Sequence, residues 1–285
     1  MEPAGLPSRP SITVGLTFLG REAVHALALG VDRPEHALVA ACAALDAAFA
    51  FVPWREPWAP GAIDALLEAG VAPFAAVDGV LWEVLEAEGV DAGLKATLLE
   101  PERITAALEA VLERRLAEAR AALDAGARAL VVAEDLAGSE GPLVAPDFAI
   151  ETLMPLLGKL VEAATAAAVP AVWHSDGDVR SLLGAAARTG FSAVHAGGGL
   201  RFEGFERVFW AARSAGLMTI GGLTTLDLAE GLVRAEALGS RAGLLARAGK
   251  LLVADDGGVT TAREAHALIR AVAAAREAAG ARDGA

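Results

Sequence analysis

The chain has 285 residues, 54% of them hydrophobic, and its formal net charge at pH 7 is −13. A charge this negative repels phosphate backbones and anionic lipid headgroups, so it argues against nucleic acid or a membrane surface as partner. Neutral or cationic small molecules, or a bound metal ion, fit better. The single cysteine, Cys42, excludes an intrachain disulfide and a metal site made of cysteines alone.

Two further features predict a cytoplasmic protein. Residues 1–9 lack the apolar core of a signal peptide, and the apolar stretch 37–52 is interrupted by Asp46 and is too short to span a bilayer. A lone cysteine is also typical of proteins from a reducing compartment. Tyrosine is absent from the chain, which removes one common acid/base group.

Short apolar segments alternate along the chain with longer segments rich in Ala, Leu, Glu and Arg. Apolar residues recur at helical spacing within 108–123 and 153–161, which predicts helices there. Nearly continuous hydrophobic strands are typical of a parallel sheet covered on both sides by helices. The predicted strands are residues 12–18, 48–53, 72–77, 129–134, 169–174, 191–195, 217–221 and 250–254.

Eight such units favour closure into a (β/α)8 barrel, with an open, doubly wound sheet as the alternative. We expect one barrel domain over residues 1–285, with disorder beyond Gly280. Asp178 is predicted to cap a helix over 179–189, and Thr225 a helix over 226–238. Gly190 and Gly216 are predicted to end helices.

Polar residues and glycines follow seven of the predicted strands, whereas the opposite strand ends carry mostly Ala, Val, Arg and Pro. In a parallel barrel the carboxyl ends of all strands meet at one mouth, where active sites lie. The sequence therefore predicts a functional site at this mouth. The segments are Pro53-Trp54-Arg55, Asp78-Gly79, Glu134-Asp135, His174 to Asp178, His195 to Gly199, Gly221 to Thr225 and Asp255 to Gly258.

The strongest candidates for catalysis are His174 and Asp176, with Glu134 or Asp135. Positions two apart on a strand point to the same side, so His174 and Asp176 can both face the mouth. A histidine beside carboxylates can transfer protons or ligate a metal. Glu134 and Asp135 are adjacent, so only one of them can point inward. The alternative for His174 is a hydrogen bond within the barrel rim, and for Asp178 only a capping role.

Other residues at the predicted mouth are candidate substrate contacts. They are Trp54, Arg55, Asp78, His195 and Gly222. Trp54 and Trp58 flank Arg55, and such a group can stack on a flat ligand or hold a carboxylate, or can simply pack beneath a loop. His195 can share a metal with His174 and a carboxylate. Glycines at 197–199 and 221–222 let a ligand approach the backbone closely.

The segment from Glu134 to Gly222 resembles the uroporphyrinogen decarboxylase superfamily, which includes cobalamin-dependent methyltransferases. The most specific piece reads PAVWHSDGD and covers residues 170–178. The other pieces are Glu134 to Ala137 followed by Gly141 and Pro146, then Met154-Pro155, residues 190–195, and Gly221-Gly222-Leu223 followed by Leu228 and Gly231.

The resemblance implies a barrel enzyme acting on a small or tetrapyrrole-related substrate, with His174 and nearby carboxylates as its acid/base pair. The family's R-Q-A-G-R motif, its pyrrole-binding aspartate and its tyrosine have no counterpart here, which argues against uroporphyrinogen itself as substrate.

The methyltransferase branch implies the alternative of a zinc-dependent corrinoid or thiol methyltransferase. Its His-x-Cys and distant Cys ligands would be replaced by His174, Asp176 and Asp255. A homodimer or a corrinoid protein would be the protein partner, and a ligand-binding barrel without turnover is the third hypothesis.

Overall fold

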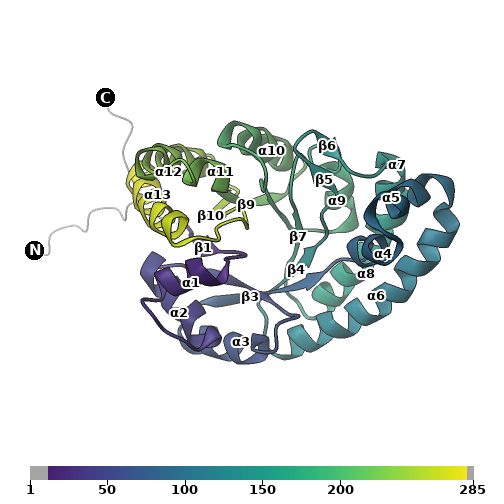
Figure 1. Cartoon of the computed structure of the whole chain (residues 1–285), viewed down its shortest axis with the longest axis horizontal. Helices are drawn as coiled ribbons and strands as arrows, with labels where there is room; N and C mark the ends of the chain where they lie inside the picture. The colour runs from purple at the N-terminus through teal and green to yellow at the C-terminus, as the bar shows by residue number, and fades with distance from the viewer. Residues whose placement is uncertain (1–11, 281–285) are drawn as a thin grey trace, which may run out of the picture.

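Eight parallel strands form one sheet in which each strand pairs with the next along the chain, in the order β1-β2-β3-β4-β7-β8-β9-β10. The computed structural model describes residues 12–280. Val14 bridges Val253, and the Val253 N–H donates to the Thr13 carbonyl at 2.9 Å, so the first strand meets the last. The predicted (β/α)8 barrel is therefore confirmed (Figure 1). The strands are β1 (Gly15–Leu16), β2 (Phe49–Pro53), β3 (Ala72–Asp78), β4 (Ala129–Ala133), β7 (Ala171–Ser175), β8 (Ala193–Ala196), β9 (Met218–Leu223) and β10 (Leu251–Asp255).

Helices surround the barrel, and a small antiparallel hairpin follows the fourth strand (Figure 1). The hairpin consists of β5 (Ala137–Gly138) and β6 (Gly141–Pro142). The helices are α1 (Arg21–Leu27), α2 (Pro34–Leu45), α3 (Ala59–Glu68), α4 (Leu81–Glu88), α5 (Val90–Leu99), α6 (Pro101–Asp124), α7 (Pro146–Phe148), the π-helix η1 (Ala149–Leu153), α8 (Met154–Ala166), α9 (Leu183–Thr189), α10 (Phe202–Ser214), α11 (Thr225–Leu228), α12 (Leu232–Ala246) and α13 (Ala262–Gly280).

Each predicted strand is present, and β1 differs most because it is only two residues long. A Cβ atom on Gly15 would lie 2.0 Å from Cζ of Phe49, so only glycine leaves room for the Phe49 ring inside the barrel. The large Phe49 ring of β2 thus requires a glycine in β1. A glycine weakens the hydrophobic pattern from which a strand is predicted, so the bounds of this strand are hard to predict from the sequence.

Two predicted helix starts are corrected. Asp178 does not cap a helix at 179, because its carboxylate binds the Arg180 guanidinium and α9 begins at Leu183. Thr225 does not cap the next helix, because it is the first residue of α11 and the N-cap position is Thr224; the predicted helix is also divided into α11 and α12. Gly190 and Gly216 follow helices with positive φ, as predicted. The prediction for residues beyond Gly280 lies outside the described residues.

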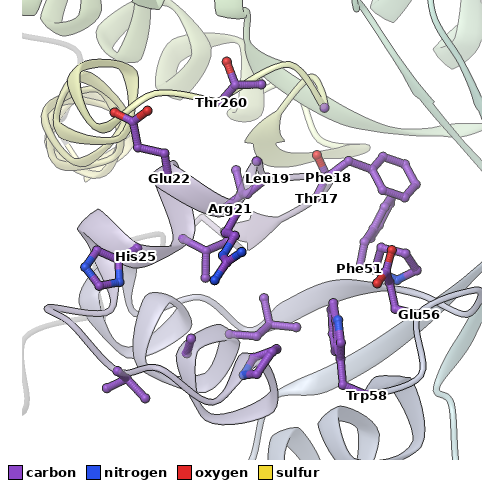
Figure 2. Close-up of a pocket in the computed structure, with 18 of the residues that line it drawn as sticks. Thr17, Phe18, Leu19, Arg21, Glu22, His25, Phe51, Glu56, Trp58 and Thr260 are labelled. Carbon is purple, nitrogen blue, oxygen red and sulfur yellow. The ribbon is translucent and has the colours of Figure 1, made fainter.

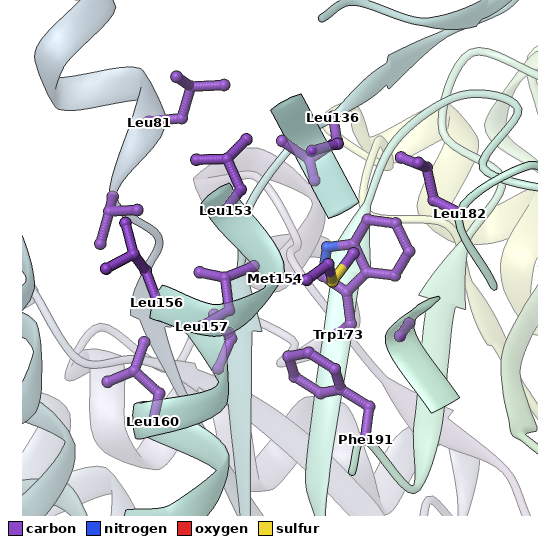
Figure 3. Packing of buried hydrophobic residues seen from close by; sticks show 14 of the residues in the cluster. Leu81, Leu136, Leu153, Met154, Leu156, Leu157, Leu160, Trp173, Leu182 and Phe191 are labelled. Carbon is purple, nitrogen blue, oxygen red and sulfur yellow. The ribbon is translucent and has the colours of Figure 1, made fainter. Parts of the chain in front are cut away.

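The barrel has an inner core and a thicker outer core between strands and helices. Phe49, Phe51, Val172 and Ile220 belong to the inner core. In the outer core, the fully buried Trp173 ring of β7 lies among leucines and Met154 of α8 (Figure 3). Side chains of β7 therefore point alternately into the inner and the outer core. His174, which follows Trp173, points inward toward the mouth. Within residues 12–280, no helix is long and apolar enough to cross a membrane.

Candidate metal centre

Three titratable side chains meet at the mouth, one on the fourth-strand loop and two on β7 or its loop. One ligand atom each from Asp135, His174 and Asp176 lies within 4.8 Å of the others. His174 Nε2 is 3.7 Å from Asp135 Oδ1 and 4.0 Å from Asp176 Oδ1. These separations are too long for hydrogen bonds but short enough for one ion to contact all three groups. The structure thus brings together three of the four predicted catalytic residues.

A chain of hydrogen bonds sets which His174 nitrogen faces this cluster. His195 Nε2 lies 3.0 Å from the Asp255 carbonyl oxygen, which can only accept, so His195 carries its proton on Nε2. Burial lowers the pKa of both imidazoles, and the neighbouring His195 lowers the pKa of His174 further, so both rings are neutral. His195 Nδ1 therefore accepts from the Nδ1–H of His174 at 2.7 Å. His174 Nε2 is left with a lone pair directed at the two aspartates.

A backbone N–H holds Asp135, and the Asp176 carboxylate lies against a glycine loop. The Asp176 N–H donates to Asp135 Oδ1 at 2.8 Å. A Cβ on Gly198 would lie 1.9 Å from Asp176 Oδ1, so a side chain at this position would displace the Asp176 carboxylate from where it lies. Burial raises the pKa of Asp135, and burial together with the charges of Asp135 and Asp256 raises the pKa of Asp176 to about 7. A cation in the cluster would relieve this repulsion.

Glu134, the other half of the predicted acidic pair, faces away from the mouth. Its buried Oε2 accepts from the N–H groups of Val80 and Leu81 at 2.5 and 2.9 Å, where α4 begins. A Cβ on Gly79 would collide with this carboxyl group. Burial raises the pKa of Glu134 to about 7. Of the adjacent acids, Asp135 is the one directed into the mouth, and Glu134 holds the β3–α4 loop.

Asp255, predicted as the third metal ligand, lies outside the cluster. Its carboxylate accepts from the N–H and hydroxyl of Thr17 at 2.9 and 2.5 Å, and from the Gly257 N–H at 3.1 Å. Asp256 accepts from the Thr225 N–H and hydroxyl. Both carboxylates therefore hold neighbouring loops together by hydrogen bonds. The third possible metal ligand is Asp135, and not Asp255 of the eighth strand as the resemblance implied.

The predicted substrate contacts divide into two groups. Arg55 and Asp78 line a cavity beside the cluster and lie 3.7 Å apart. Trp54 lines neither cavity described below and packs against the outer core instead. Gly222 is also in neither, since it lies against Phe205, where a Cβ would approach the ring to 3.3 Å. His195 is fully buried beneath His174.

One cavity adjoins the cluster, and a second cavity, which Figure 2 shows, shares lining residues with the first. One, of about 580 Å³, is lined by Asp135, His174 and Asp176 together with Trp82 and Arg115. The other, of about 1030 Å³, lies between α1, α2 and the β2–α3 loop. Their shared lining residues are Phe18, Pro53, Arg55 and Gly257. Sequence reasoning missed Phe18, Trp82 and Arg115. Phe18 is the last residue of the first predicted strand, whose end carries no polar side chain to mark it. Trp82 and Arg115 lie on helices, where nothing in the local pattern distinguishes them from structural residues.

Phe18 covers the candidate centre. Its ring centroid lies 4.9 Å from that of His174 and 5.3 Å from that of Phe51. This packing shields the imidazole from water on one side, which strengthens electrostatic interactions there. The remaining side of the cluster faces the smaller cavity.

Replacing His195 by Phe tests the hydrogen-bond chain. Phenylalanine fills the space but offers no acceptor, so the His174 Nδ1–H loses its partner and its tautomer is no longer imposed. For a zinc ion held by His174 and the two aspartates, as proposed below, we expect the affinity to fall about 10- to 100-fold, the usual effect of removing such an outer partner. Competition titration against a zinc chelator measures this. The exposed His266 of α13, changed to Phe, is the control. Unchanged zinc affinity in His195→Phe would show that the chain does not orient His174.

A closed barrel with titratable groups at the carboxyl ends of its strands is the architecture of the (β/α)8-barrel enzymes. Residues 79–222, half of the chain, match the uroporphyrinogen decarboxylase (URO-D) family model, and the chain belongs to this family. The match includes Asp135, His174 and Asp176. No curated protein matches the chain.

Solved structures share the fold. A methyltransferase from Methanosarcina mazei superposes with a TM-score of 0.67 at 16% identity, covering 94% of both chains. A D-psicose 3-epimerase, crystallised in the presence of D-fructose, superposes with a TM-score of 0.53 at 11% identity, covering 95% of this chain and 100% of the other. At these identities the likeness concerns the fold alone.

Proposed function

We propose that this chain is an enzyme of the URO-D superfamily that binds one divalent metal ion, zinc as first candidate, on Asp135, His174 and Asp176. It uses that site to act on a small organic molecule held in the adjoining cavity. The observation that carries the proposal is the His174 Nε2 lone pair, directed at two carboxylates that have no basic partner of their own at the cluster.

The residues fit a metal ion by their chemistry. One imidazole nitrogen and two carboxylate oxygens are ligand types that zinc accepts, and three protein ligands are typical of catalytic zinc sites. The Nδ1–H bond to His195 is the second contact that metal-binding histidines usually make. Cysteine takes no part: Cys42 is buried in α2, and burial raises its pKa to about 12. The donor set is thus harder than the Cys-containing set of the resembling methyltransferases.

A bound zinc ion would act as a Lewis acid toward a substrate oxygen, nitrogen or sulfur atom. The protein's own residues would do the rest. Asp135, fixed by the Asp176 N–H, and His174, fixed by His195, keep the ligand atoms in position. Arg55 borders the cluster's cavity and can bind an anionic part of the substrate. Phe18 limits access of water to His174.

Methyl transfer is the reaction class that we assign first to this site, because the resemblance links zinc in this superfamily to that reaction. A metal-free, decarboxylase-like reaction is the second candidate. It is favoured by Asp176, whose pKa near 7 would let the same carboxyl donate or accept a proton at neutral pH. His174, with its lowered pKa, would then be a hydrogen-bonding group and not the proton donor.

Metal titration of chelator-treated protein tests the proposal. We expect one equivalent of zinc per chain in the native sequence, and affinity at least about 100-fold lower in Asp135→Asn, which keeps the size of the side chain but removes the charge. Asp178→Asn is the matched control, because the Asp178 carboxylate is bound to Arg180 instead of the cluster. If zinc does not bind, or binds equally to Asp135→Asn, the metal proposal fails and the acid–base candidate takes its place.

A further inference from the structure

The pairing of β4 with β7 ends at the candidate metal centre. The last pair in register is Ala133 with His174, and the Glu134 N–H then donates to the His174 carbonyl at 3.0 Å. In a parallel ladder, the next bonds would join the Asp176 N–H to the Glu134 carbonyl and the Leu136 N–H to the Asp176 carbonyl. Each of these four backbone groups binds a side chain instead.

Two of the four groups bind side chains that are described above. The Asp176 N–H donates to the Asp135 carboxylate at 2.8 Å, which joins two members of the cluster. The Glu134 carbonyl accepts from the Trp173 indole N–H at 2.9 Å. Trp173 and Leu136 both lie in the outer core (Figure 3). The first missing ladder bond is thus replaced by one bond within the cluster and one from the outer core.

The Ser175 hydroxyl replaces the second missing bond. It is fully buried, accepts from the Leu136 N–H at 2.9 Å and donates to the Asp176 carbonyl at 3.0 Å. The Leu136 N–H belongs to the peptide group that follows Asp135. One hydroxyl therefore lies between the backbone of two candidate metal ligands, where a direct hydrogen bond would draw the two loops together.

We propose that Ser175 is a positioning residue for the metal centre. Its hydroxyl is a spacer that holds the Asp135 and Asp176 loops at the separation at which both carboxylates and His174 can contact one ion. A hydroxyl suits this position because it donates and accepts at the same time. The inference rests on the proposed function for the ion, but the spacing of the loops requires no metal.

Ser175→Ala tests the proposal, because it removes the spacer and leaves room for the direct bond. In the crystal structure of the metal-free variant, the Leu136 nitrogen and the Asp176 carbonyl oxygen should approach to about 2.9 Å. Zinc affinity, measured by competition titration, should fall about 10- to 100-fold, because the ligands lose their separation. The visible absorption of the Co²⁺-loaded variant should differ from that of the native chain, since it depends on coordination geometry.

Thr219→Val and Ser175→Thr are the controls. Thr219 of β9 is as fully buried as Ser175, but its hydroxyl has no hydrogen-bond partner among residues 12–280. Thr219→Val should therefore keep the native zinc affinity and Co²⁺ spectrum. Ser175→Thr keeps the hydroxyl and should retain most of the affinity. Urea unfolding of each variant ensures that folded proteins are compared, and Ser175→Ala decides the matter if the added methyl group prevents Ser175→Thr from folding.

Three results would overturn the proposal. They are native zinc affinity in Ser175→Ala, loops at their native separation in its metal-free structure, and a loss of affinity in Thr219→Val as large as in Ser175→Ala. A folded Ser175→Thr variant that binds zinc no better than Ser175→Ala would also contradict it.

The same measurements separate this inference from the proposed function. If the native chain binds no zinc but the loops of metal-free Ser175→Ala come together, the metal proposal alone is wrong. If the native chain binds zinc and Ser175→Ala binds it equally well, only the role of Ser175 is wrong.

Discussion

His174→Ala should lose metal binding while remaining folded. The variant lacks the only nitrogen ligand of the cluster, so we expect zinc affinity to fall on the order of 100-fold or more, beyond the usual effect of losing an outer partner. Once the substrate is known, turnover should fall by a similar factor. The free energy of unfolding should decrease by about 1–3 kcal/mol, because His195 Nδ1 loses its hydrogen-bond donor and Phe18 loses a packed ring.

Both quantities should be measured on one preparation of metal-free protein, by urea unfolding and by zinc titration. His36→Ala, on α2 and remote from the cluster, controls for the loss of an imidazole as such. A large loss of stability with zinc affinity unchanged would mean that His174 has a structural role. The functional interpretation of the HSDGD segment would then have to be withdrawn.

Trp173→Ala should have the largest effect on stability. Trp173 is fully buried in the outer core, and its Nε1–H donates to the Glu134 carbonyl at 2.9 Å. Replacing a buried aromatic ring by a methyl group costs about 3–5 kcal/mol through lost burial and an unfilled cavity. The Glu134 carbonyl would also lose its side-chain donor. Chemical denaturation with tryptophan-independent detection, such as far-UV circular dichroism, measures the change.

Trp210→Ala is the matched control, because Trp210 lies on α10 with 46% of its surface exposed. Its loss should cost about 1 kcal/mol or less. Similar losses in the two variants would contradict the packing described for β7. Trp173 also adjoins His174, so a loss of zinc affinity in Trp173→Ala should accompany its loss of stability.

The fold could be predicted from the sequence because local chemistry repeats. Each strand is a short hydrophobic segment, and each is followed by a helix-forming segment, so the parallel, helix-covered sheet follows from the alternation alone. The boundaries depend on tertiary contacts: β1 is short because Gly15 must yield space to Phe49 from the neighbouring strand, and the helix after Thr225 is divided into α11 and α12.

The candidate site could be predicted in part. Strand ends identify His174, Asp176 and the pair Glu134–Asp135, because the carboxyl ends of parallel strands converge. Trp82 and Arg115 reach the mouth from helices, and their local sequence carries no sign of it. Asp255 was predicted at the site but does not belong to it. Its carboxylate lies at a strand end, as predicted, but accepts hydrogen bonds from Thr17 of a neighbouring loop.

The sequence by itself determined the barrel fold and the end of the barrel at which the titratable residues lie. Both follow from local patterns: the alternation of hydrophobic strands with helices, and the polar residues that come directly after each strand. Only the tertiary structure decided which acid faces His174 and which nitrogen His174 presents. Asp135 faces it because Glu134 is held by the N–H groups of Val80 and Leu81, and Nε2 is presented because His195 is bound to the Asp255 carbonyl. These are contacts between residues at least 50 positions apart, and no local pattern encodes them.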